Sequence, residues 1–243
     1  MVLLYIPPVQ NLLRREVTAY ASKATGMQIQ VERIHLRFPL NLLVRGVEVI
    51  QQPDTLLSLE SLNVRVQAWP LLKGKVEVDE VTLSQVAVNS ANLIEGMQIK
   101  GVLGRFFLQS HGVDLSNETA VVNRTELSDT HIQLLMTDTT TTPKDTTASA
   151  PVNWKVNLHQ LKLKNVSFGM KLPADSMKMA AYIGEATIDD AKADLKNQFY
   201  GLKQFLLSGA SASYDTGEAQ PSEGFDASHM AVRNIRIGLD SLL

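Results

Sequence analysis

The chain lacks cysteine altogether, which excludes disulfide frameworks, thiolate metal sites and cysteine nucleophiles. It also lacks an excess of basic charge. Its net charge is -2 at pH 7, so the positive field that attracts nucleic acid is missing. The chain has 243 residues, enough to bury a core. Its fractions of hydrophobic residues, 44%, and of charged residues, 20%, are ordinary for a folded protein.

Catalytic and metal-binding motifs are missing as well. There is no Gly-x-Ser-x-Gly elbow, no Gly-x-x-x-x-Gly-Lys loop and no His-x-x-x-His pair among the five histidines. The densest acidic group, Asp189, Asp190 and Asp194, does not have the spacing of a calcium loop and is expected on a turn or a solvent-facing strand. We therefore expect no catalytic residue, no metal ligand and no cofactor, and a protein that is not an enzyme.

The first eight residues, Met1–Pro8, are apolar but far shorter than the roughly 20 residues that span a bilayer. They also lack the basic region and cleavage site of a signal peptide. One interpretation is the last turn of a transmembrane anchor whose remainder is absent from the chain; the alternative is a first strand or a segment packed on the core. The apolar pattern that ends at Leu242-Leu243 has no closing turn, so both ends look cut.

A helix is predicted next, over about Val9 to Thr25, within an N-terminal segment 1–26. Proline at its start and Gly26 at its end are ordinary start and stop signals. Its apolar residues recur every three or four positions, as an amphipathic helix requires: Val9, Leu12, Leu13, Val17, Tyr20, Ala21 and Ala24. No other long helix is expected.

After Gly26 the apolar period changes to two, which predicts strands with one face on apolar material and the other in water. Examples are Met27, Ile29 and Val31; Ile34, Leu36 and Phe38; Leu62, Val64 and Val66; and Trp154, Val156 and Leu158. The fold class is therefore mostly β: an N-terminal amphipathic helix followed by a curled antiparallel β-sheet, an open groove, with flexible polar loops.

A loose repeat supports successive strands of similar design. Its four copies are Val44–Val49, Leu83–Val88, Leu163–Phe168 and Val232–Ile237. Near the middle of each copy stands Gly, Gln or Asn, and there the apolar phase shifts by one residue, as it does at a β-bulge. The copies begin 39, 80 and 69 residues apart (83 − 44, 163 − 83, 232 − 163), which is too irregular for a strict solenoid.

One segment breaks the strand pattern. Residues 137–151 are rich in threonine and have too little apolar surface to offset the entropy of ordering, so they are predicted to be a flexible spacer loop. They divide a first β region, 27–136, from a second, 152–243, which is expected to continue the same sheet. A shorter loop is expected around Thr216 to Ser228.

The segment from Leu59 to Leu83 resembles the N-terminal region of the TamB/AsmA-like family. That region has a strand, a Pro-Leu-Leu-x-Gly-Lys turn, here Pro70–Lys75, and a strand that ends in Ile or Val, x, Leu, here Val81–Leu83. The predicted helix ending at Gly26 also lies where the family has one. Two later segments, Ile183–Ile188 and Tyr200–Phe205, look like relatives from Bacteroides-type bacteria.

This resemblance implies a membrane anchor just before Val2, a long β groove in the periplasm, and anchoring to the inner membrane. It also implies phospholipid transport to the outer membrane and a part in outer-membrane protein assembly. The implied partners are phospholipid or other apolar cargo, the membrane, and an outer-membrane barrel assembly protein.

The residues that we expect to line such a groove are apolar members of alternating strands: Val64, Val66, Val76, Val78, Val81 and Leu83. Periodicity identifies a buried face but not what covers it, so an ordinary packed core is the alternative for each of them. Three functions therefore compete: a lipid conduit, a scaffold that pairs with a barrel protein by strand addition, and a β spacer without cargo.

Overall fold

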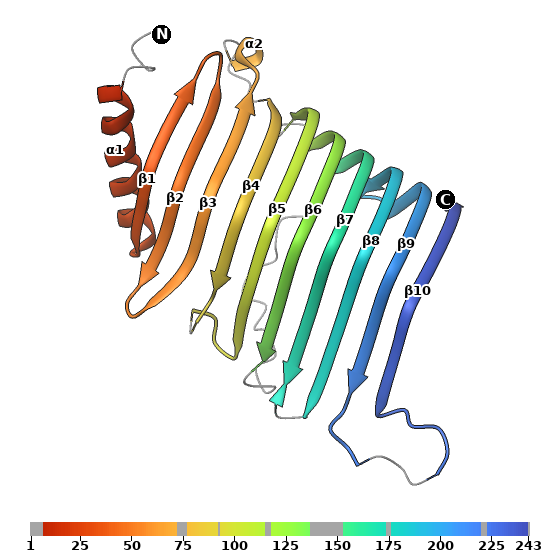
Figure 1. The fold of residues 1–243 in the computed structure, drawn as a ribbon. Helices are drawn as coiled ribbons and strands as arrows, with labels where there is room; N and C mark the ends of the chain where they lie inside the picture. The colour runs from red at the N-terminus through yellow and green to blue at the C-terminus, as the bar shows by residue number, and fades with distance from the viewer. Residues whose placement is uncertain are drawn as a thin grey trace.

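The computed structural model describes residues 7–71, 77–91, 93–114, 118–136, 153–173, 176–219 and 223–242. Over these residues the chain forms one long helix and then ten strands of a single sheet, drawn in chain order in Figure 1. The elements are α1 (Pro7–Thr25), β1 (Gln28–Arg37), β2 (Asn41–Gln51), β3 (Asp54–Val66), α2 (Ala68–Leu71), β4 (Val78–Asn89), β5 (Met97–Asp114), β6 (Thr119–Met136), β7 (Lys155–Leu172), β8 (Met177–Asp194), β9 (Phe199–Asp215) and β10 (His229–Leu242).

The sheet is open: β1 and β10 are its two edges, and neighbours in the chain are neighbours in space. The prediction of a mostly β chain behind an N-terminal helix is confirmed. The prediction of a purely antiparallel sheet is wrong, because β6 and β7 run parallel. A parallel pair requires the connecting chain to return along a strand's length. The predicted loop 137–151 belongs to this connection and lies outside the described residues.

The helix α1 follows the predicted bounds to within two residues at its start, and Gly26 ends it with a φ of 70°, in the left-handed region that glycine adopts easily. It lies along β1 at the edge of the sheet (Figure 1). Its side chains bind backbone groups of that strand: Gln10 Nε2 donates to the carbonyl of Leu36 at 3.0 Å, and Arg14 Nη1 donates to that of Glu32 at 2.7 Å. One edge of the sheet is therefore covered by a helix.

The register places apolar side chains in rows that cross the whole sheet. One row, which we call the Val64 row, contains Leu36, Leu42, Val64, Val81, Leu108, Thr125, Leu161, Ile188, Phe205 and Leu239. A second, the Phe168 row, contains Ile29, Val49, Leu57, Val88, Gly101, Ile132, Phe168, Ala181, Ala212 and Val232. Both rows lie on one side of the sheet, which we call the apolar face; the residues that alternate with the apolar ones along each strand point to the other side, which we call the polar face.

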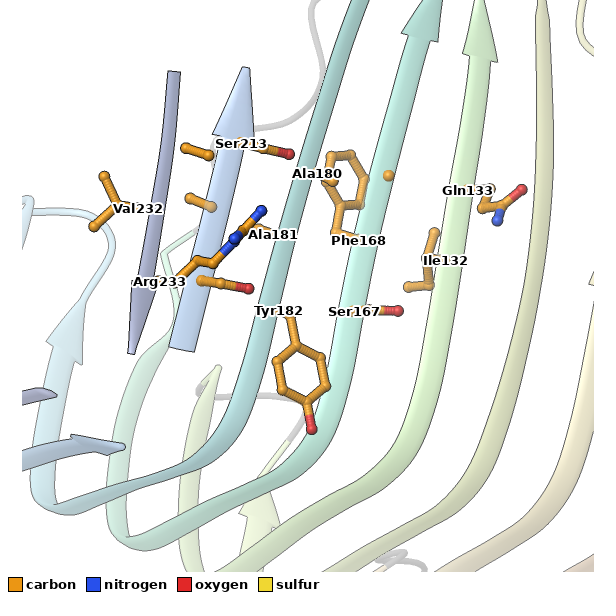
Figure 2. A pocket seen from close by; sticks show the side chains of 14 residues that line it. Ile132, Gln133, Ser167, Phe168, Ala180, Ala181, Tyr182, Ser213, Val232 and Arg233 are labelled. Atoms are coloured by element: carbon orange, nitrogen blue, oxygen red, sulfur yellow. The ribbon is translucent and has the colours of Figure 1, made fainter. Parts of the chain in front are cut away.

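Between the two rows the ladder skips one residue in each strand from β1 to β8, it skips two in each strand between β8 and β9, and it is irregular between β9 and β10. We give the name kink row to one skipped residue in each strand: Glu32, Gly46, Glu60, Gln85, Gly104, Asp129, Asn165, Gly184, Gly209 and Asn234. The skip keeps apolar residues on one face although their spacing changes from two to three, as between Leu163 and Val166. Figure 2 shows the ribbons of neighbouring strands curving strongly below Ser167 and Tyr182, next to this row. The kink row is therefore where the sheet bends.

The repeat in the sequence marks this row. Its four middle residues, Gly46, Gln85, Asn165 and Asn234, all lie in the kink row, and their φ angles run from 50° to 59°. Left-handed backbone at non-glycine residues is uncommon, and Asn is among the residues that tolerate it best. The predicted shift of phase at these residues is confirmed. Phe38 is a smaller correction: the alternation extends it into a strand, but it is exposed in the turn after β1.

No second layer covers the apolar face within the described part of the chain, which supplies only α1 and the short α2 besides the sheet. The buried hydrophobic residues in the described part of the chain are few: Ile34, Leu56, Ala120, Val122, Ala186 and Ala210. Ala186 and Ala210 stand on the apolar face beside the kink row, together with Thr130, which is 2% exposed. Small side chains are therefore buried at the bend, whereas several larger side chains farther from it stay open to solvent.

Candidate functional site

The candidate site is the apolar face. Of the residues predicted to line a groove, Val64 stands opposite Val81 in the register, and Val66 stands opposite Val78. Leu83 stands in the next row toward the bend. All five are half-buried and lie on the apolar face. The sixth, Val76, lies outside the described residues. The structure thus brings the described candidates together on one face of β3 and β4.

A buried polar residue, Ser110, lies next to this part of the apolar face, beside β4. The hydroxyl of Ser110 in β5 donates to the carbonyl of Val78, and Ser110 is 3% exposed. The bond satisfies a carbonyl just outside the paired part of the β4–β5 ladder, whose first described pair on this side is Glu80 with Gln109. An apolar surface can include such a residue at no large cost because the hydroxyl is hydrogen-bonded.

Several open apolar side chains lie on the other side of the kink row, and we did not single them out from the sequence. In the Phe168 row, Val88 is 38% exposed, Ile132 40%, Phe168 42% and Val232 58%. Residues of this size in a packed core are buried almost completely. The alternation in β7 and β10 could have identified Phe168 and Val232, but alternation cannot tell a covered position from an open one.

An apolar depression of about 260 Å³ lies within this open part of the face, over β7 to β10. Its floor includes Ala181 and Ala212, whose small side chains leave room between larger neighbours. The neighbours on the same face are Phe168, Met179, Tyr214, Met230 and Val232. The arrangement offers an alkyl group contact on several sides and almost no hydrogen-bonding partner.

Some of the charged groups in the described residues pair with one another, the densest set around Asp190. Asp190 Oδ1 is 3.0 Å from His159 Nδ1, and Asp190 Oδ2 is 3.6 Å from Lys203 Nζ. All three residues lie where the ladders on either side of β8 skip residues for a second time. Hydrogen bonding from His159, with a smaller contribution from Lys203, holds the pKa of Asp190 below its usual value. Hydrogen bonds from Asn197 lower the pKa of Asp194 in the same way. All three acidic residues lie in the strand β8, which is one of the two predicted placements; Asp190 is exposed, and Asp189 and Asp194 are half-buried.

A lowered pKa in the folded state predicts a pH dependence of stability. The contribution of Asp190 is present above the usual aspartate value of 3.8 and is lost as the pH falls through the lower folded value. In urea unfolding at pH 6, Asp190→Asn is therefore expected to have a lower midpoint than the wild type. At pH 2 the two midpoints should coincide. A difference of the same size at both pH values would contradict this assignment.

Among the described residues, no group of three or more His, Cys, Asp and Glu side chains is placed to hold a metal ion. Neither described helix is both long enough and apolar enough to cross a membrane. Comparison with known proteins gives no further guide, since no protein-family model and no curated protein matches the chain.

Proposed function

We propose that this chain is a hydrophobic β-groove segment of a periplasmic protein of the TamB/AsmA-like kind, anchored to the inner membrane, which shelters phospholipid on its way between the envelope membranes. One observation carries the proposal: apolar residues continue in register across ten strands, and no second layer covers them in the described part of the chain. The resemblance at Pro70–Lys75 supplies the family and the compartment.

The physical case rests on the cost of exposing lipid to water. Each exposed methylene costs about 0.8 kcal/mol, so a carrier needs an unbroken apolar lining along the path of the chain. With ten strands spaced about 4.8 Å apart, each apolar row is roughly 40 Å long. The bend at the kink row, with Thr130, Ala186 and Ala210 buried beside it on the apolar face, favours a trough whose inside is apolar.

Site-specific photocrosslinking in cells tests the proposal. A photoreactive amino acid at Val66, on the apolar face, is expected to capture phospholipid at least about tenfold more often than one at the neighbouring Arg65, which is exposed on the polar face. The same contrast is expected between Phe168 and Ser167. Equal capture at both members of each pair would show that the apolar face is not the lipid path. Absence of lipid at every position would favour a spacer without cargo.

A second candidate function is favoured by the other edge of the sheet. Whereas α1 covers β1, the edge strand β10 has no outer neighbour among the described residues, and most of its side chains are exposed. Unpaired backbone groups on such an edge can accept an added strand. A scaffold for outer-membrane protein assembly would use this edge, and crosslinks from β10 positions to a barrel assembly protein would support it over the lipid conduit.

A further inference from the structure

The polar face carries two adjoining hollows that the lipid path does not use. The larger, of about 540 Å³, and the smaller, of about 350 Å³, share Gln133, Gly169, Ala180 and Ser213. Figure 2 shows the smaller one. There Arg233 and Val232 leave β10 in opposite directions, as neighbours on opposite faces of a strand do. The smaller hollow, which both residues line, therefore lies on the side of the sheet to which Arg233 points, opposite to the side chain of Val232.

The register explains why there is space. Gln133, Gly169, Ala180 and Ser213 pair in sequence across β6 to β9, in one row of the polar face that begins at Lys100 in β5. Three of the four have small side chains or none, so the row forms a low floor. The next row outward contains Leu135, Lys171, Lys178 and Asp215, and its longer side chains border that floor.

Three lysines line the larger hollow: Lys100, Lys171 and Lys178. Lys171 and Lys178 stand directly opposite each other in the antiparallel β7–β8 ladder, an arrangement of like charges that destabilises a sheet. Within the described residues, none of the three lysines takes part in a salt bridge. The positive charge at this hollow is therefore concentrated although the whole chain carries a net charge of -2.

Asp215 also lines the hollow and stands opposite Lys178. Its carboxylate is turned to other partners, however: Oδ1 accepts from the backbone N–H of Gly217 at 2.7 Å and lies 3.4 Å from His229 Nε2. It forms no ion pair with Lys178. The acidic residue in the lining of the hollow therefore forms no ion pair with the lysines.

We propose that this hollow binds a phosphate group, with Lys171 and Lys178 on either side of it and Lys100 across the floor. An oxyanion between the two opposed ammonium groups turns an unfavourable pair into two charge-assisted contacts, and a lysine is a common partner of phosphate. The phosphate can belong to a soluble ester or to a lipid headgroup. The proposal does not depend on lipid transport, because it concerns the other face of the sheet.

The test compares two triple variants of the full chain with equal changes of charge. The site variant is K100Q/K171Q/K178Q. The control is K162Q/K164Q/K192Q, which removes three lysines from β7 and β8 on the other side of the kink row. Calorimetric titration with glycerol 3-phosphate measures binding of a soluble ester. Flotation with vesicles of phosphatidylglycerol, against vesicles of phosphatidylcholine, measures binding of a lipid-borne phosphate.

In at least one of the two arms, the wild type and the control variant are expected to bind alike, and the site variant at least about tenfold more weakly. Binding in the first arm identifies a soluble ester as a ligand, and binding in the second alone identifies a headgroup. An equal loss in both variants would overturn the proposal, because binding would then depend on the overall charge of the chain and not on this hollow. Absence of binding by the wild type in both arms would overturn it as well. If the soluble ester binds in the first arm, thermal unfolding gives a second readout, in which glycerol 3-phosphate should stabilise the wild type and not the site variant.

Discussion

Replacing Val88 by aspartate is expected, under the proposed function, to reduce the phospholipid bound to the purified chain by at least about tenfold, with little effect on folding. Val88 lies on the apolar face and is 38% exposed, so a carboxylate there stays hydrated as long as no lipid is bound. Lipid binding would strip that hydration, at a cost of several kcal/mol, and each 1.4 kcal/mol corresponds to a factor of ten in binding. Native mass spectrometry measures the lipid, and circular dichroism measures the fold.

The matched control is Val102→Asp. Val102 stands opposite Ala87, one residue before Val88, and is 46% exposed on the polar face. The same substitution is thus made on the neighbouring strand, one row away and on the other side of the sheet. It should leave the lipid content unchanged. If Val88→Asp unfolded the protein, the residue would belong to a packed core. If both variants kept their lipid, the cargo would lie elsewhere.

A methyl group added at Gly104 is expected to destabilise the protein by about 1–3 kcal/mol. A Cβ at this position in the kink row would lie 2.7 Å from the Cβ of Asp129 and 3.0 Å from its carbonyl oxygen, and the backbone of β6 must shift to accommodate it. Gly104→Ala should therefore lower the free energy of unfolding, measured by urea titration. It should also disturb the bend locally.

Gly169→Ala provides the comparison. Gly169 also lies within a strand, but the nearest atoms to an added Cβ are 3.9 Å and 4.0 Å away, an ordinary contact distance. Its effect on the free energy of unfolding should stay within about 0.5 kcal/mol. Equal effects of the two substitutions would show that close approach at the kink row is unimportant for stability.

The sequence was most informative where a local rule determines the structure. The helix α1 is defined by proline, glycine and a three-to-four spacing, and the strand faces are defined by alternation over stretches such as Leu62 to Val66. The repeat even located the kink row, because Gly, Gln and Asn stand where the phase shifts. Each of these features depends on residues that are close together in the chain.

Features that depend on distant residues were out of reach. Nothing near Met136 or Lys155 specifies that β7 runs parallel to β6, because the direction depends on the path of the whole connection. The exposure of Phe168 depends on the lack of a layer above it, and no pattern within β7 encodes that. The pairing of Lys171 with Lys178 follows from the register of a hairpin, which the sequence did not predict. For the same reason the hollow on the polar face was not foreseen.

The helix along β1 has a consequence for association between copies. Edge-to-edge association of sheets can continue without limit only if every molecule has two free edges, so that it can pair with a neighbour on each side. Here Gln10 and Arg14 occupy carbonyls of β1, and only β10 remains available among the described strands. Contact between two such β10 edges would join a single pair of the described sheets and then stop, because α1 covers the opposite edge of each.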